Sequence, residues 1–236
     1  MTWLLPETNW MFIHIPKTGG TSINKSLKDA GHTLQKVKLD SKLIRANLNP
    51  DLKQIPPHSK LSEMINCGLV VHDYNYFAQV RNPYTRIVSL YYFAQQQDLS
   101  RIQGDAETSR VKKSITWYKK RHSILNNMTF TQFVEKFSDD SWRQQFDQEW
   151  LFEPTTQLRY GWQRQHEWLD GADVKFFKLE KSDKIVKFIH NKGVDVEYKH
   201  YKNQGIRNYM DHYTPQTRDI VHRYFKEDFE RYEYSR

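Results

Sequence analysis

The first clear pattern along the chain is a short apolar run that turns into a helix. Residues 11–15 (MFIHI) are typical of a buried strand, and Pro16 with the pair Gly19-Gly20 ends this strand in a sharp turn. From residue 21 to residue 30 the apolar positions recur at helical spacing, and Gly31 stands where a helix commonly ends. The pattern predicts a strand, a glycine-rich turn and a helix in that order.

The same arrangement occurs a second time. Residues 76–80 form a largely apolar run, and Asn82 and Pro83 follow in the positions typical of a helix N-cap and a first helical residue. Apolar residues between 87 and 92 then continue at helical spacing. A second strand, turn and helix are therefore predicted.

The rest of the chain is predicted to be mainly helical, with one further strand region. Helices are expected to begin near Thr129, Ser182 and Pro215. Residues 95–113 are polar and show no sustained period, which indicates a long surface loop of the kind that often contacts substrates. Strands that lead into helices, without a repeat or a second boundary, predict one α/β domain over residues 1–236.

The first turn has the features of an anion site. The start of a helix carries unpaired N–H groups and the positive end of the helix dipole. Lys17 adds a full charge, and the hydroxyls of Thr18, Thr21 and Ser22 add donors. Lys17 precedes the glycines, whereas a nucleoside-triphosphate loop reads GxxxxGK[ST]. The alternative is an ordinary strand-to-helix turn with a surface lysine.

The second turn has cationic and hydroxyl donors of its own. Arg81 at the strand end and Ser89 on the helix can converge on one anion, and the guanidinium supplies a bidentate fork. Arg86 shares a helix face with Ser89, but pairing of Arg86 with a carboxylate and close packing at Ser89 are the alternatives. Two anion-binding turns in one small domain predict a ligand with two separate anionic groups.

Together the two stretches resemble a known family. PKTGGTS at 16–22 and RNPYTRIVS at 81–89 resemble the paired signatures of sulfotransferases that use 3′-phosphoadenosine 5′-phosphosulfate. The resemblance is closest to the carbohydrate sulfotransferases of the Golgi-type superfamily and their bacterial relatives. Gln79 departs from this pattern, which commonly has phenylalanine there. Looser similarities occur in the same order at 57–61 (PHSKL), 174–180 (VKFFKLE) and 213–234.

The resemblance implies a P-loop-like α/β fold in three layers, with a central, mainly parallel sheet flanked by helices. It implies that the first loop holds the 5′-phosphosulfate of the donor and that Arg81 and Ser89 hold its 3′-phosphate. The loop residues assigned to the donor are Lys17, Thr18, Gly19, Gly20, Thr21 and Ser22. Lys17 is also a catalytic candidate, because an ammonium there can stabilise charge on the leaving phosphate. No metal is expected, since that leaving group is already a stable phosphate.

The acceptor hydroxyl requires a general base. His58 is favoured because it stands at a Pro-Pro-His helix start before the second motif, as in the resembling bacterial enzymes, and imidazole has a pKa near the working pH. His72 is the second candidate and His14 the third, although His14 alternatively packs beneath the loop. A carboxylate such as Glu63 or Asp73 remains an alternative.

Composition narrows the choice of partners. The 236-residue chain carries a formal charge of +8, which favours an anionic ligand. Nucleic acid is not expected, because the longest basic run is residues 119–121 and no nucleic-acid motif is present. The single Cys67 excludes an internal disulfide, and no CxxC or HExxH spacing indicates a metal site. No apolar run approaches the roughly 18 residues that span a bilayer, so we expect a cytoplasmic protein. Because animal members of the resembling family are usually Golgi-anchored, the resemblance then implies a bacterial or bacterial-virus origin.

A carbohydrate hydroxyl is the expected acceptor, because the closest resemblance is to carbohydrate sulfotransferases. Four tryptophans are candidates for stacking on a sugar ring, with a place in the core as the alternative: Trp117, Trp142, Trp150 and Trp162. Two other function classes stay open. One is a kinase-like or nucleotide-hydrolysing enzyme, which the absent GxxxxGK[ST] disfavours, and the other is a non-catalytic module that binds nucleotide or anionic glycan.

Overall fold

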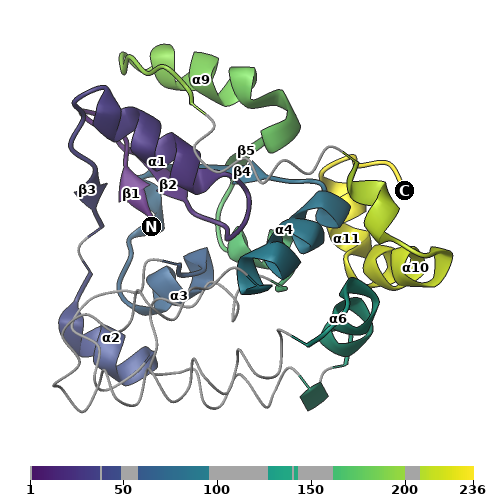
Figure 1. Ribbon diagram of the computed structural model, residues 1–236. Helices are drawn as coiled ribbons and strands as arrows, with labels where there is room; N and C mark the ends of the chain where they lie inside the picture. The colour runs from purple at the N-terminus through teal and green to yellow at the C-terminus, as the bar shows by residue number, and fades with distance from the viewer. Residues whose placement is uncertain are drawn as a thin grey trace, which may run out of the picture.

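The computed structural model describes residues 2–37, 39–48, 58–95, 127–139, 141–142, 162–199 and 208–236. Within these residues a five-stranded sheet lies between helices, so the fold is α/β with three layers (Figure 1). The strands, in the spatial order β3-β1-β2-β4-β5, are β3 (Gln35–Lys36), β1 (Trp3–Leu4), β2 (Trp10–Ile13), β4 (Asn75–Val80) and β5 (Val174–Lys178). The three longest strands, β2, β4 and β5, are parallel, while β1 runs antiparallel to both of its neighbours. The expected sheet between helices is thus confirmed.

The parallel pairing of β2 with β4 decides where the two predicted turns lie. Trp10 pairs with Asn75 and Ile13 with Ala78, so the two strands are aligned. Aligned parallel strands have their carboxyl ends at one edge of the sheet, which is where α/β proteins bind ligands. The turn after β2 and the turn after β4 therefore lie next to each other.

Helices follow the strands and cover the sheet. In Figure 1, α1 and α9 lie over one face and α3 over the other. The helices are α1 (Gly20–Asp29), α2 (Ser41–Asn47), α3 (Leu61–Asn66), α4 (Pro83–Gln95), α6 (Phe130–Phe137), α9 (Ser182–His190), α10 (Pro215–Tyr224) and α11 (Lys226–Arg231). Short 3₁₀ turns are η1 (Val71–Asp73), η3 (His166–Trp168), η4 (Leu179–Lys181) and η5 (Tyr209–His212). The described chain contains no helix long and apolar enough to cross a membrane.

Each face of the sheet has its own apolar core. Phe12, Phe77 and Phe177 point toward α1 and α9, where Ile23 and Phe188 are among the residues that pack on them. Alternate residues of the same strands face the other way, as the period of two requires. That opposite face packs on α3 and η3 through Met11, Ile13, Tyr76, Ala78, Val80, Leu61, Met64 and Trp168.

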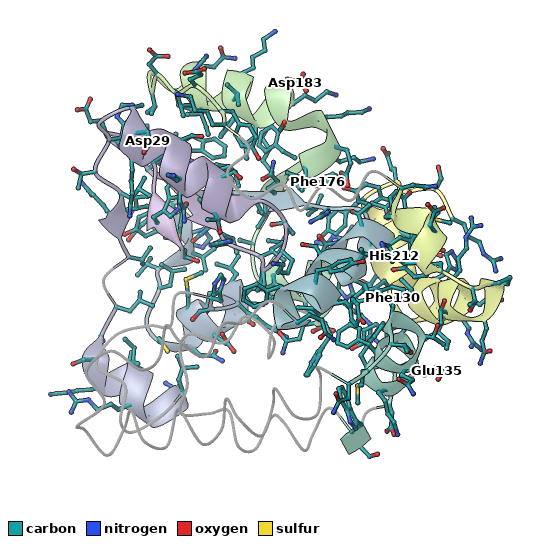
Figure 2. All side chains as sticks on the ribbon, viewed as in Figure 1. Asp29, Phe130, Glu135, Phe176, Asp183 and His212 are labelled. Carbon is teal, nitrogen blue, oxygen red and sulfur yellow. The ribbon has the colours of Figure 1, made fainter. Side chains whose placement is uncertain are left out.

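A third apolar cluster lies beside the sheet and joins α4, α6, α10 and α11. Phe130 of α6 packs on His212 of η5, with ring centroids 5.7 Å apart (Figure 2). Trp142 and Trp162 are buried in this cluster and lie 5.9 Å apart between ring centroids. Both tryptophans are therefore core residues, which is the alternative to sugar stacking that the sequence left open for them.

Most predicted helix starts agree with the structure. The Tyr84 N–H donates to Asn82 Oδ1 at 2.9 Å, so Asn82 caps α4 as expected. The helix after His58 is different, because α3 begins at Leu61 with Lys60 as its N-cap. The Glu63 carboxylate accepts from the Lys60 N–H at 2.9 Å and fixes the start there. His58 thus precedes the helix instead of standing at its N-terminus.

Several sequence expectations concern residues outside the described part of the chain. They are Pro57, most of the predicted loop at 95–113, the basic run at 119–121, Trp117 and Trp150.

Candidate active site

The turn after β2 is shaped by two close contacts. Lys17 and Gly19 have positive φ angles of 68° and 88°, and Gly19 is the N-cap of α1 without a side-chain cap. A Cβ on Gly19 would lie 2.6 Å from Leu179 Cδ1, and a Cβ on Gly20 would lie 2.4 Å from His14 Nε2. Only glycine fits at both positions, because the backbone there passes close to these neighbouring side chains. Since Gly19 has no side chain, the first N–H groups of α1 have no side-chain cap.

The hydroxyls of this turn have different surroundings. Thr18 is fully buried, and its Oγ1 donates to the Ile15 carbonyl at 2.9 Å. The Thr18 hydroxyl therefore closes the turn, and a contact from Thr18 to a ligand would come from its backbone N–H. Ser22 is buried beside Tyr198, whose pKa is raised by burial although hydrogen bonding to Ser22 and Gln79 opposes the rise. Thr21 is half-buried at the start of α1.

Arg81 joins the two turns. Its Nη1 donates to the Lys17 carbonyl at 3.2 Å, and its Nε donates to Thr85 Oγ1 at 2.8 Å. Thr85 and Ser89 are four residues apart on α4 and so share a helix face. The Arg81 guanidinium lies at the Thr85 end of this face. The sequence did not single out Thr85, although its spacing from Ser89 places it on the same face.

The backbone of Arg81 is held by a residue far away in sequence. Gln165 Oε1 accepts from the Arg81 N–H at 2.8 Å, and Gln165 Nε2 donates to the Arg81 carbonyl at 2.9 Å. Gln165 is in turn held by Asp228, whose carboxylate accepts from the backbone N–H groups of Gln165 and His166. His166 also contacts Asp228 through Nδ1 at 2.9 Å. Burial disfavours charge on His166, but the carboxylates of Asp228 and Glu227 outweigh it and raise its pKa.

Glu180 completes the surroundings of the second turn. One carboxylate oxygen accepts from the Asn82 N–H at 2.9 Å, and the other accepts from the Tyr234 hydroxyl at 2.9 Å. Burial lowers the pKa of Arg81, and the charge of Glu180 opposes that shift. The end of β5 and the C-terminal segment are thereby tied to the start of α4.

Arg86 supports the first turn from α4. It is almost fully buried, and its Nε donates to the Pro16 carbonyl at 3.1 Å while Nη1 donates to the Gln163 carbonyl at 2.8 Å. Burial lowers the pKa of Arg86 to about 10, although the nearby Asp228 opposes the shift. Through these contacts with backbone carbonyls, Arg86 ties α4 to the first turn and to the segment around Gln163.

His58 and His14 lie together below the first turn. Their ring centroids are 4.5 Å apart, and His58 Nδ1 lies 3.4 Å from the His14 carbonyl. Because a carbonyl only accepts, this contact favours a proton on Nδ1 and a lone pair on Nε2. Burial is the main cause that lowers the pKa of His58 to about 3, and the charge of Lys17 adds to it. The pKa of His58 is therefore not near the working pH, as the sequence led us to expect, but well below it.

The other base candidates have different positions. His14 packs against Gly20, as the structural alternative for this residue requires, and burial lowers its pKa well below the usual value. His72 and Asp73 belong to η1 before β4, so they lie at the amino end of that strand, on the edge opposite to Arg81. Glu63 caps α3. The structure thus places His58 and His14, and not His72, beside Lys17.

Comparison with family models gives one result for the whole chain. The model of the sulfotransferase family matches residues 1–235. The chain belongs to this family. Searches of curated proteins and of solved structures find no match to this sulfotransferase. Membership establishes sulfuryl transfer as the class of reaction and a hydroxyl-bearing acceptor as the class of substrate.

The geometry gives the sulfotransferase two cationic groups at one sheet edge. Lys17 belongs to the turn after β2, and Arg81 belongs to the turn after β4. The residues that hold these groups in place, Gln165, Glu180 and Asp228, come from the last third of the chain. Glu180 was found from sequence only as the end of a loosely similar segment, and the other two gave no local signal.

Proposed function

We propose that this sulfotransferase moves a sulfuryl group from 3′-phosphoadenosine 5′-phosphosulfate to a hydroxyl of a carbohydrate. The observation that carries the proposal is the hydrogen bond from Arg81 Nη1 to the Lys17 carbonyl, 3.2 Å long. This bond joins the two turns that we propose to bind anions, at the carboxyl ends of neighbouring parallel strands. A ligand that uses both turns needs two separate anionic groups, and this donor has them.

The first turn is suited to the 5′-phosphosulfate. Gly19 caps α1 without a side chain, which leaves the start of the helix open to an anion, and the helix dipole favours negative charge there. Lys17 and the loop from Thr18 to Ser22 are the residues next to this helix start along the chain. We assign Lys17, Thr18, Gly19, Gly20, Thr21 and Ser22 to this group, with Thr18 acting through its backbone.

The second turn is suited to the 3′-phosphate. Arg81 offers a planar guanidinium, and Ser89 lies one helical turn beyond the Thr85 hydroxyl that contacts it. Burial makes a charged hydrogen bond from this guanidinium stronger than one in water. We therefore assign Arg81 and Ser89 to the 3′-phosphate and add Thr85 as a residue that orients Arg81.

In the proposed reaction the acceptor oxygen forms a bond to sulfur while the bond from sulfur to the phosphate oxygen breaks. The electron pair of the broken bond stays on the phosphate, where the Lys17 ammonium stabilises the growing charge. The acceptor proton goes to Nε2 of His58, because Nδ1 faces the His14 carbonyl. Lys17 is thus the electrostatic catalyst and His58 the general base. No divalent metal takes part.

His58 needs the bound donor to become an effective base. At a pKa of about 3 the ring is neutral at every working pH and can accept a proton, but the protonated form is poorly stabilised. Negative charge brought next to Lys17 would favour protonated imidazole and raise the pKa. We propose that donor binding has this effect, which couples proton acceptance to the presence of the donor.

Isothermal titration and a transfer assay test the proposed function. The protein should bind 3′-phosphoadenosine 5′-phosphate at least 100-fold more tightly than adenosine triphosphate with magnesium. Label from a ³⁵S donor should pass to one of a panel of glycans, without loss on adding a chelator, and Lys17→Ala should reduce the transfer by about 10²-fold or more. Tighter binding of adenosine triphosphate would favour the kinase-like alternative. Tight nucleotide binding without transfer to any acceptor and without donor hydrolysis would favour the non-catalytic one.

A further inference from the structure

The Lys17 ammonium lies over an aromatic ring. Its Nζ is 4.1 Å from the centroid of Phe93, a half-buried residue near the end of α4. This distance is within the range at which the negative face of a ring attracts a cation. Phe93 follows Ser89 by four residues and Arg86 by seven, so all three share one face of α4. Phe93 therefore belongs to the helix face that runs along the first turn.

Arginines of the second motif also fix the backbone of Lys17. Arg86 Nε donates to the carbonyl of Pro16, directly before Lys17, and Arg81 Nη1 donates to the carbonyl of Lys17 itself. Lys17 has a φ of 68°, a conformation that a residue with a side chain adopts only when its surroundings impose it. The backbone of Lys17 and its ammonium are thus both located by residues of the second motif and its helix.

A ring holds a cation differently from a carboxylate. A carboxylate partner brings a full negative charge, which offsets the field of the ammonium at the position of an incoming anion. An aromatic face attracts through its quadrupole and carries no net charge. An aromatic face can therefore restrict where a long ammonium side chain points without adding a negative charge of its own beside an incoming anion.

We propose that Phe93 is a positioning residue that fixes the Lys17 ammonium at the donor. The proposal rests on the proposed function and extends it by one residue that the sequence motifs do not include. A correctly placed ammonium matters most when charge develops on the leaving phosphate, since electrostatic catalysis depends on groups that need no reorganisation. The loss of the ring should therefore reduce kcat more than it weakens donor binding.

Three variants test the proposal by kinetics. Phe93→Leu should lower kcat by about 3- to 30-fold, with the donor KM changed by less than about twofold. Phe93→Tyr keeps the face of the ring and should stay within about twofold of the wild type. Tyr92→Leu is the matched control, because Tyr92 is the neighbouring half-buried aromatic of α4 and packs on His212. An unchanged kcat in Phe93→Leu, or equal losses in Phe93→Leu and Tyr92→Leu, would overturn the proposal.

Nuclear magnetic resonance gives a readout that does not depend on turnover. Protons on the ε-carbon of Lys17 should be shifted upfield by the ring current of Phe93, and Lys17→Arg identifies their signal by its loss. The shift should persist in Phe93→Tyr and disappear in Phe93→Leu. A signal unaffected by Phe93→Leu would refute the placement of the ammonium. An upfield shift in a protein that transfers no sulfuryl group would support the placement and count against the proposed function alone.

Discussion

The Gln165 carboxamide brackets the backbone of Arg81, accepting from its N–H at 2.8 Å and donating to its carbonyl at 2.9 Å. Gln165 has no exposed surface, so water cannot replace either bond after a substitution. The position of Arg81 therefore depends on a buried side chain that lies 84 positions away in the sequence. Asp228 extends this dependence, because it holds the Gln165 backbone through an N–H contact of 2.8 Å.

The first prediction concerns this bracket. Gln165→Leu removes the Gln165 partners of two partly buried backbone groups of Arg81, at about 1–3 kcal/mol each, so the free energy of unfolding should fall by about 2 kcal/mol or more. Affinity for 3′-phosphoadenosine 5′-phosphate should also fall. Urea unfolding and titration calorimetry measure the two effects. Gln163→Leu is the control, because the buried Oε1 of Gln163 has no partner among the described residues, and this variant should change both quantities little.

The second prediction concerns Lys17. Lys17→Ala should reduce kcat by about 10²-fold or more, which is the usual effect of removing one preorganised electrostatic donor. Alanine also has a Cβ, so the cost of the positive φ is the same and the melting temperature should change little. Thr21→Ala and Ser22→Ala should mainly weaken donor binding, because their backbone N–H groups persist. A Lys17→Ala enzyme with normal kcat would remove the assigned role.

The third prediction separates the two anion sites. Ser89→Ala should weaken binding of 3′-phosphoadenosine 5′-phosphate by about tenfold or more and binding of adenosine 5′-phosphosulfate little, since only the former carries a 3′-phosphate. Arg81→Ala should show the same preference with a larger loss, of up to about a hundredfold. It should also disturb the first turn, because the Lys17 carbonyl loses its donor. Equal losses for both ligands in Ser89→Ala would show that this side chain is structural.

The fourth prediction concerns His58 as general base. His58→Ala should lower kcat by about 10²- to 10⁴-fold and leave affinity for 3′-phosphoadenosine 5′-phosphate nearly intact. The profile of kcat/KM for the donor against pH reports the free enzyme, in which the pKa of His58 is about 3. This profile should therefore show no limb from His58 between pH 5 and pH 8. The kcat profile reports the enzyme with donor bound, so an acidic limb should appear there and vanish in the variant. Full activity in His58→Ala, with loss in His14→Ala, would move the role to His14.

The fifth prediction concerns stability in acid. Below pH 6.5 the unfolded chain binds a proton at His58, whereas the folded protein does not until the pH approaches its pKa of about 3. The contribution of the neutral His58 ring to the free energy of unfolding is therefore complete above pH 6.5. This contribution decreases as the pH falls toward 3, by up to roughly 1.4 kcal/mol per pH unit. His58→Gln should reduce this slope in urea unfolding measured from pH 7 to pH 4. An acid slope that stays the same in His58→Gln would contradict this contribution.

Local signals in the sequence predicted the parts of the site that lie next to each other along the chain. The glycines at 19 and 20, the cap at Asn82 and the helix spacing after each turn act within a few residues, and the structure has them as expected. The adjacency of the two turns followed from the parallel strands that the fold class implied. The short antiparallel strands β1 and β3 were missed, because two residues are too few to show a period.

The contacts that hold Arg81 could not be predicted in the same way. Gln165 and Arg81 are 84 positions apart, and a lone glutamine gives no periodic or motif signal. The burial of His58 could not be predicted either. His58 was singled out from the sequence, but its burial depends on how the segment before α3 packs beneath the first turn. Tertiary burial changed its pKa by more than any local feature could indicate.

The dependence of Arg81 on Gln165 and Asp228 also sets an order of events during protein synthesis. Both proposed anion-binding motifs have been translated by residue 89, but Arg81 has its backbone partner only after residue 165 emerges, and that partner has its own support only after residue 228. A nascent chain released early would therefore carry the residues that we assign to the two anionic groups and still lack the contacts that hold Arg81. Under this proposal, tight nucleotide binding would report that the chain has been translated past Asp228 and has folded.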